Sequence, residues 1–292
     1  MYLTHIGIAD ILLEVRSPLS PAALGIEEKL GPFFGHAADS PEKVLIDWRE
    51  GDPVRPPEGN LIYDPGTMWR MYASSDRRTF HAHISYPAAE HEKPTEALLT
   101  ANPTWSELSL TERRQGAPWR SLLSLGVGEL IVRTRILFAG GIVFHASGID
   151  DGGRGIVFVG HSGAGKSTLA ELWSNVAGVG PMNDDRVAVR LTDGGAVAYG
   201  LPWGGAAGIE RNCRAPLSAL FVLEQSRDNA VHALPEKSSI PLLLARSFLP
   251  YWDRELMLRA LAVVEALVER VPVYLLRWRL EPSVVPLVRS VL

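Results

Sequence analysis

The sequence of 292 residues contains a single cysteine, Cys213, so the chain can form no internal disulfide. A small fold held together by disulfides is therefore excluded, and a reducing compartment fits best. Basic residues are not in excess, because 29 lysines and arginines stand against 33 aspartates and glutamates, a formal net charge of −4. This balance gives no electrostatic reason to bind nucleic acid or an anionic membrane, so we expect neither as a partner.

Long apolar runs are also missing. No run approaches the roughly 20 residues that a membrane-spanning helix needs. The N-terminal stretch MYLTHIGIADILLEVRSP carries Asp10 and Glu14 inside its apolar run and has no basic leader, so it does not resemble a signal peptide. From these absences we expect a cytoplasmic protein.

What the chain does have is enough length and apolar content, 46% of its residues, for two cores. Up to about Tyr86, short apolar runs alternate with turns rich in proline and glycine, which predicts strands. The predicted strands are residues 8–15, 43–48, 61–64, 68–73 and 79–86. Residues 87–103 predict a connector, within which Glu96 to Thr100 could carry a short helix. We therefore predict a β-rich α+β domain over residues 1–110 and an α/β domain over residues 111–292.

In the second part, helical spacing of leucine and isoleucine predicts an amphipathic helix within residues 119–141. Apolar strands are predicted at 142–149, 155–159 and 217–225, and Asp193-Gly194 predicts a hairpin between two further strands. Residues 240–248 and 255–271 favour helix, and residues 271–280 favour a strand.

The stretch GHSGAGKST satisfies the pattern G-x-x-x-x-G-K-[ST] between a predicted strand and a predicted helix. Glycines in such a loop let successive backbone N–H groups surround phosphates, and the helix that follows adds the positive end of its dipole. The lysine reaches the β- and γ-phosphates, and the serine hydroxyl binds Mg²⁺. The predicted nucleotide-binding residues are Gly160, His161, Ser162, Gly163, Ala164, Gly165, Lys166, Ser167 and Thr168. A nucleoside triphosphate with Mg²⁺ is the ligand that this pattern predicts.

Two carboxylates, Asp184 and Asp185, follow in PMNDDRVAV. If both face one site, their repulsion raises at least one pKa unless a metal compensates. One carboxylate on the metal and its neighbour accepting a proton from a hydroxyl would suit this pair. His145 lies at the end of the neighbouring predicted strand; on pattern alone, a histidine in an apolar stretch is more often a core residue than a functional one.

The segment FHASGIDDGGRGIVFVGHSGAGKSTLAELW, followed by NDDRVAV, resembles the catalytic domain of bacterial HPr kinase/phosphorylase and the broader HPr-kinase-like group. That group shares its core with the ATP-dependent phosphoenolpyruvate carboxykinases. The resemblance runs roughly from Gly141 to Leu223, and the order of histidine, phosphate loop and Asp-Asp carries it. It implies a P-loop core of this type, preceded by the smaller β-rich domain.

The resemblance also implies roles. Lys166 would act on the phosphates, Ser167 and Asp184 would bind magnesium, and Asp185 would receive the proton of a serine hydroxyl. The resemblance places His145 in the same site and Glu210 at a further metal-linked position. The resemblance also suggests that the chain can assemble into a homo-oligomer.

The sequence departs from that family where GIERNCRAP replaces the Glu-x-Arg-Gly run of HPr kinases, so neither the HPr partner nor a reverse phosphorylase activity carries over. Arg211 and Arg214 in this segment are candidates to neutralise the transferring phosphoryl group, or are solvated loop residues. We expect an ATP- and Mg²⁺-dependent kinase that acts on a hydroxyl, serine in a protein or peptide. The alternatives are a small-molecule kinase, for example of free serine, and a nucleotide-binding sensor or interaction module with little catalysis. A GTPase ranks low because no N-K-x-D stretch is present.

Overall fold

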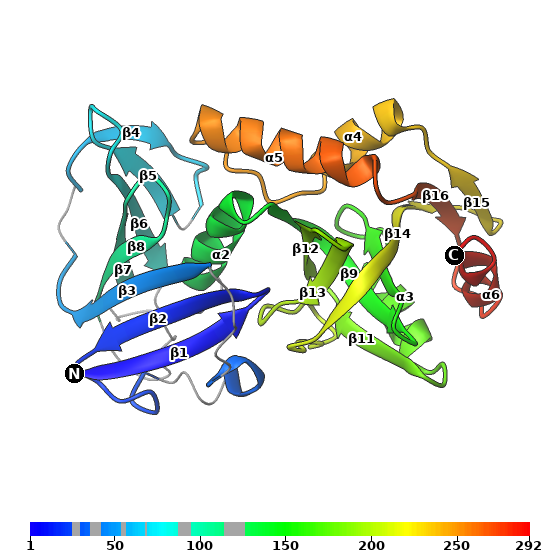
Figure 1. Cartoon of the computed structure of the whole chain (residues 1–292), viewed down its shortest axis with the longest axis horizontal. Coiled ribbons are helices and arrows are strands. Elements are labelled where there is room, and N and C mark those ends of the chain that lie inside the picture. Colours follow the sequence, from blue (N-terminus) through cyan, green and yellow to red (C-terminus); the bar gives the residue numbers. More distant parts are fainter. Residues whose placement is uncertain (25–29, 36–41, 54–56, 68, 87–94, 114–125) are drawn as a thin grey trace. The chain divides into compact units, whose positions relative to one another are not determined.

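The computed structural model describes residues 1–24, 30–35, 42–53, 57–67, 69–86, 95–113 and 126–292. Its contacts divide the chain into two compact units (Figure 1). The first unit comprises Met1–Arg135 together with Tyr251–Asp253, and the second comprises Ile136–Pro250 together with Arg254–Leu292. The chain has a mixed α/β architecture with two large sheets.

The first unit is built on an eight-stranded sheet in the order β1-β2-β3-β8-β7-β6-β5-β4. The β2–β3 and β3–β8 pairs are parallel, and the other neighbours are antiparallel. The strands are β1 (Tyr2–Ile8), β2 (Ile11–Ser17), β3 (Lys43–Glu50), β4 (Asn60–Tyr63), β5 (Trp69–Ala73), β6 (Phe80–Tyr86), β7 (Thr95–Ala101) and β8 (Glu107–Arg113), with a 3-10 turn η1 at Gly31–Phe33. Helix α2 (Val127–Phe138) runs across the division between the units.

Two predictions for this unit are wrong. Glu96 to Thr100 is part of strand β7 and not a helix, because Ala97, Leu99 and Ala101 are buried at every second position and this period matches a strand. The predicted strand over residues 8–15 is interrupted by a tight turn at Ala9 and Asp10, both with positive φ, which joins β1 to β2. Residues 87–94 of the predicted connector and 119–125 of the predicted helix lie outside the described residues.

The second unit has a sheet in the order β10-β9-β12-β13-β14-β16-β15, with β11 paired to β9. An additional parallel pairing of β10 with β14 closes β10, β9, β12, β13 and β14 into a ring of strands. The strands are β9 (Gly141–Asp151), β10 (Gly155–Val159), β11 (Val179–Asn183), β12 (Arg186–Thr192), β13 (Gly195–Gly200), β14 (Arg214–Gln225), β15 (Ala230–Ala233) and β16 (Val273–Trp278). The predicted hairpin at Asp193-Gly194 is confirmed, since Thr192 pairs with Gly195.

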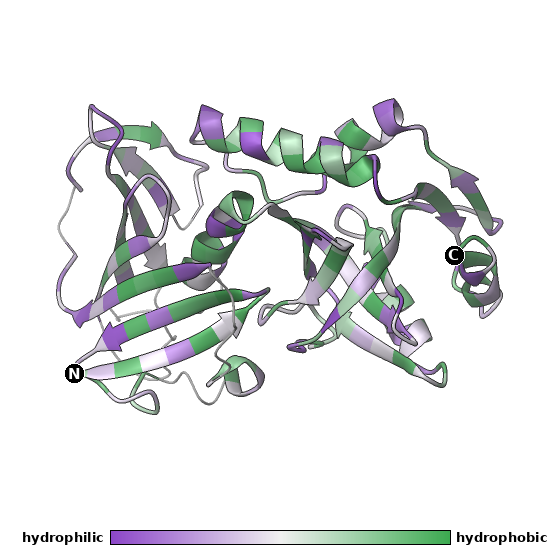
Figure 2. Cartoon of the chain, viewed as in Figure 1, coloured by the Kyte–Doolittle hydropathy of each residue, from purple (hydrophilic) through white to green (hydrophobic). Residues whose placement is uncertain are grey.

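Four more helices complete this unit: α3 (Lys166–Ser174), α4 (Glu236–Leu244), α5 (Arg254–Val268) and α6 (Val284–Arg289). Hydrophobic and hydrophilic residues alternate along α5 (Figure 2), and its buried residues recur at helical spacing, among them Leu256, Ala260 and Val264. Helices α3 and α6 pack with β10, β14 and β16 around Phe158, Trp173 and Phe221. Among the described helices, none combines the length and apolar character that crossing a membrane requires.

The helix predicted over residues 240–248 ends early. Helix α4 stops at Leu244, and the next residues run beside β9, where Ser247 bridges Phe144 and the Phe248 N–H donates to the Val143 carbonyl. Backbone pairing to a strand far away in the sequence therefore ends the helix, and a local helical pattern cannot show this. The consequence is that Arg246 lies next to β9.

Candidate functional site

The glycine-rich loop lies between β10, which ends at Val159, and α3, which begins at Lys166. Gly163 and Gly165 have φ of +81° and +90°, a region that favours glycine. A Cβ atom on Gly165 would lie 2.4 Å from Cζ2 of Trp278, and the Trp278 indole donates to the Ala164 carbonyl at 3.2 Å. The loop thus has the strand, turn and helix context that the sequence pattern requires, and β16 supports it from one side.

Lys166 points back across the loop. Its Nζ donates to the carbonyls of Gly160 and His161, each at 3.1 Å, and the residue is only 6% exposed. Burial lowers the pKa of Lys166, while the nearby charges of Asp185 and Asp184 oppose this shift. The loop therefore holds one buried ammonium group at the end where it leaves β10.

Asp184 is buried and surrounded by donors. Its Oδ1 accepts from the N–H groups of Gly205 at 2.8 Å and Ile209 at 3.2 Å, and its Oδ2 accepts from the N–H of Ala207 at 2.9 Å. The Ser167 hydroxyl donates to Oδ2 at 3.3 Å. The structure thus brings together two of the predicted metal ligands, and the segment that follows β13 wraps around one of them.

Glu210, the third predicted metal ligand, accepts a hydrogen bond at 2.8 Å from the Gly204 N–H and is exposed. Its backbone pairs with Asn183. No group of three histidine, cysteine, aspartate or glutamate side chains that could hold a metal occurs within the described parts of the chain. Ser167 and Asp184 offer two hard oxygen atoms, which fits Mg²⁺ because this ion usually keeps several waters and phosphate oxygens among its ligands.

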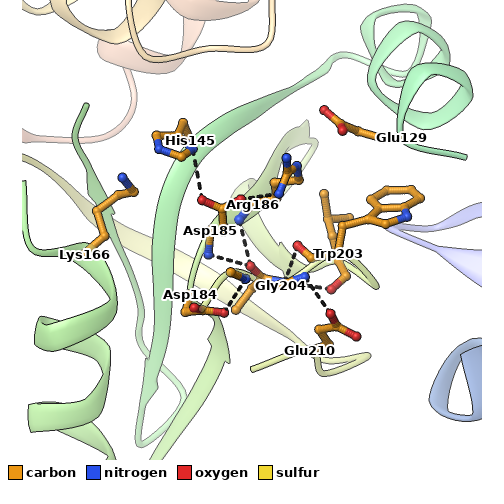
Figure 3. A network of polar contacts seen from close by, with 12 residues as sticks. Glu129, His145, Lys166, Asp184, Asp185, Arg186, Trp203, Gly204 and Glu210 are labelled. Carbon is orange, nitrogen blue, oxygen red and sulfur yellow. Dashed lines mark hydrogen bonds and ion pairs between the residues drawn. The ribbon is translucent and has the colours of Figure 1, made fainter. Parts of the chain in front are cut away.

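Asp185 faces away from Asp184 and toward β9 (Figure 3). Its Oδ1 lies 3.2 Å from Nδ1 of His145, and its Oδ2 accepts from Nη1 of Arg186. The strand register explains the meeting, since Arg186 pairs with His145 across β12 and β9. The His145 carbonyl accepts from the Gly160 N–H at 3.3 Å, so the His145–Asp185 pair lies beside the glycine-rich loop.

Sequence reasoning missed Asn183, whose side chain holds the backbone at Asp185. Its Oδ1 accepts from the N–H groups of Asp185 at 2.8 Å and Arg186 at 2.7 Å, and its Nδ2 donates to the carbonyls of Leu201 and Trp203. Asn183 is fully buried, so these bonds are not shared with water. The Asn-Asp-Asp order is the local signal, because asparagine often hydrogen-bonds backbone N–H groups two residues on.

Two cavities flank the loop. One of about 300 Å³ is lined by Gly165 and Thr168 together with the last residues of β14 and β16 and the residues after them: Gln225, Ser226, Trp278, Arg279 and Leu280. The other, about 470 Å³, is lined by His161, the last residues of β14, Leu275 of β16, Leu242 of α4 and Arg246. The loop therefore has one cavity at each end, and Gln225 lines both.

Arg211 and Arg214, the two arginines that the sequence suggested for the phosphoryl group, lie away from the glycine-rich loop. Arg214 opens β14, eight residues before Val222, whose partner Val159 is the last residue before the loop. At about 3.3 Å per residue this is roughly 25 Å along the strand. Arg211 lies beside Gly180 of β11, near Asp150 and Cys213. Neither position is at the loop.

No family model matches the chain, and no curated protein was found to match it. Among solved structures, the chain is similar to the HPr(Ser) kinase/phosphatase from Coxiella burnetii. The two are 14% identical, the similarity covers 51% of this chain and 94% of that one, and the TM-score is 0.31.

Proposed function

We propose that the protein is an ATP- and Mg²⁺-dependent phosphotransferase that moves the terminal phosphoryl group to a hydroxyl. The observation that carries the proposal is the meeting of three features at one place: the loop with Lys166, the Ser167–Asp184 pair and the His145–Asp185 pair. A protein that only binds nucleotide has little use for the last of these. Phosphoryl transfer needs charge neutralisation, a metal and a group that accepts the hydroxyl proton.

The position of Lys166 sets the direction of the bound nucleotide. A lysine of this motif reaches the β- and γ-phosphates, and here its ammonium is held at the Gly160–His161 end of the loop. The terminal phosphate then lies at that end, beside the His145–Asp185 pair. The nucleoside lies at the opposite end, in the cavity of about 300 Å³ next to Gly165 and Thr168, where Arg279 and Trp278 form part of the wall.

Ser167 and Asp184 are the residues that would hold the metal. When bound, Mg²⁺ neutralises negative charge on the phosphates. Asp184 already accepts three backbone hydrogen bonds, which fix its carboxylate and leave Oδ2 turned toward the Ser167 hydroxyl. This preorganisation lets the chain present both oxygen atoms without rearranging the segment from Gly204 to Glu210.

In the proposed reaction a bond forms between the acceptor oxygen and the terminal phosphorus, and the bond to the bridging oxygen breaks to leave ADP. Asp185 takes the proton of the acceptor hydroxyl. His145 and Arg186 each contact one oxygen of this carboxylate, but each oxygen has two lone pairs, so accepting sites remain. The two contacts fix the orientation of Asp185 relative to the loop.

For the acceptor we propose serine in a protein or peptide, with free serine or another small hydroxyl metabolite as the second candidate. The test is transfer from ATP labelled at its γ-phosphate by the purified chain, offered a cell lysate, serine peptides and small hydroxyl compounds. Label in a protein or peptide supports the first acceptor, and label in a soluble metabolite supports the second. Binding of Mg·ATP with no transfer to any acceptor would contradict the proposal and favour a nucleotide sensor.

A further inference from the structure

Arg246 is a cation with no counter-ion among the residues that the structure describes. Its side chain makes one hydrogen bond, from Nη1 to the Leu242 carbonyl at 2.9 Å, and its buried Nε has no partner. Within the described part of the chain no carboxylate lies within ion-pair distance of it. Burial lowers the pKa of Arg246, and no neighbouring charge opposes the shift. A partly buried cation without a partner is costly, which favours an anionic ligand at this place.

Arg246 borders a cavity of suitable size. Arg246 lines the cavity of about 470 Å³ together with His161 of the glycine-rich loop. The carbonyl of His161 is one of the two that hold Lys166. The cavity therefore opens at the end of the loop where the proposed orientation of the nucleotide puts the terminal phosphate.

The backbone of Arg246 is attached to the proposed proton acceptor. The His145 N–H donates to the Arg246 carbonyl at 2.8 Å. Two residues on, the Phe248 ring packs against the edge of His145, with centroids 6.0 Å apart, and under the Arg186 guanidinium at 5.1 Å. One short segment thus supports the His145–Asp185–Arg186 group and carries the arginine that lines the cavity.

We propose that Arg246 binds the terminal phosphate of the nucleotide and neutralises its charge during transfer. This role rests on the proposed function. Lys166 alone is a single cation for a triphosphate, and in phosphoryl transfer an arginine is a common source of the further charge. The planar guanidinium can donate two parallel hydrogen bonds to phosphate oxygens.

The test compares binding of Mg·ADP with binding of a non-hydrolysable ATP analogue, Mg·AMP-PNP, to the full chain by calorimetry. We expect Arg246→Gln to weaken AMP-PNP binding by about tenfold or more and to leave ADP binding within about twofold, because only AMP-PNP carries the terminal phosphate. Arg246→Lys should recover part of the loss. The matched control is Arg259→Gln, which removes an arginine that covers Phe138 from α5; both affinities should stay unchanged.

Equal AMP-PNP affinity in Arg246→Gln and the parent would overturn this role, and so would equal weakening of both nucleotides, which indicates damage to the fold. A variant that keeps both affinities and loses only transfer would place Arg246 on the acceptor and also overturn it. If the parent binds neither nucleotide, the proposed function fails and the role of Arg246 fails with it. Nucleotide binding by the parent protein therefore distinguishes a failure of the proposed function from a failure of the role of Arg246 alone.

Discussion

Adjacent aspartates in this protein have different surroundings, although the sequence presents them as a pair. Asp184 is buried among backbone N–H groups and the Ser167 hydroxyl, whereas Asp185 is partly exposed between His145 and Arg186. The backbone donors fix the orientation of the Asp184 carboxylate, which suits a metal ligand. In the proposed reaction, its contact with a histidine beside the loop suits Asp185 to receive the proton of an incoming hydroxyl. The proposed division of labour between the two aspartates therefore rests on these different surroundings.

We predict that Asp185→Asn keeps nucleotide affinity and lowers the rate of phosphoryl transfer by about 10² to 10⁴, the usual contribution of a general base. Asparagine keeps the size of the side chain but cannot take the proton. The matched control is Asp193→Asn in the exposed turn between β12 and β13, which should transfer at the parental rate. Nucleotide binding and label transfer are measured on the same preparations. Transfer at the parental rate in Asp185→Asn would refute its role as the base.

Among single residues, sequence analysis identified those that lie within one short motif. It missed those that distant segments of the chain bring to the site. The glycines, Lys166 and Ser167 form one uninterrupted pattern, so their arrangement could be predicted. The donors to Asp184 come from backbone N–H groups more than 20 residues later, and no side-chain pattern marks them. Arg246 reaches the loop only because the chain returns to pair with β9, which local periodicity cannot show.

Among the elements, the loop depends on its contact with β16. We predict that Gly165→Ala abolishes nucleotide binding and destabilises the second unit. Positive φ alone costs about 1–2 kcal/mol for a residue with a Cβ, and the added atom would lie 2.4 Å from Trp278. Gly194→Ala is the control, since a Cβ there meets nothing within 4 Å. Binding is followed by calorimetry and stability by thermal denaturation; a Gly165→Ala variant that binds like the parent would show that the loop tolerates this change.

A second prediction concerns the attachment of α6 to β9. Arg289 of α6 donates from Nη2 and Nε to the buried Asp151 carboxylate at 2.5 and 3.0 Å, and Arg154 donates to the same group. These bonds, that from Arg289 first, hold the pKa of Asp151 below its ordinary value. A lowered pKa in the folded state means that the pair stabilises the fold above the unfolded pKa of about 4 and loses this effect as the pH falls through the folded pKa.

Asp151→Asn should therefore be less stable than the parent at pH 7, and the difference in free energy of unfolding should shrink below about pH 4. Denaturation curves at a series of pH values measure it, with Asp193→Asn as the control that follows the parent throughout. A difference that is constant from pH 7 to pH 3 would mean that the charge of Asp151 does not contribute.

Elements with a clear local sequence pattern were predicted well. Elements that form by pairing with segments distant in the sequence were not. The 15 residues of α5 and the buried strand β10 follow their sequence patterns directly. The polar character and the prolines of residues 87–103 predict a connector, and Glu96 to Thr100 could carry a short helix within it, but Thr95–Ala101 forms strand β7. Hydrogen bonds to its neighbours β6 and β8 hold this segment as a strand. The long strands β9 and β14 each serve two sets of partners, which no local pattern indicates.

For the whole molecule, the two units give a way to locate nucleotide binding, since every residue of the proposed site belongs to the second unit. A ligand that binds only the folded state stabilises it, by about 2.7 kcal/mol at 100 times its Kd. We therefore predict that Mg·AMP-PNP protects the amide hydrogens of β9, β10 and α3 from exchange, and leaves the exchange of β4, β5 and β6 in the first unit unchanged. Lys166→Ala should lose this protection, because removing the buried ammonium takes away the charge that the loop offers to the phosphates. Hydrogen exchange followed by mass spectrometry resolves the two units in one experiment. Protection of the first unit with none in β10 and α3 would place the nucleotide elsewhere and overturn the proposed site.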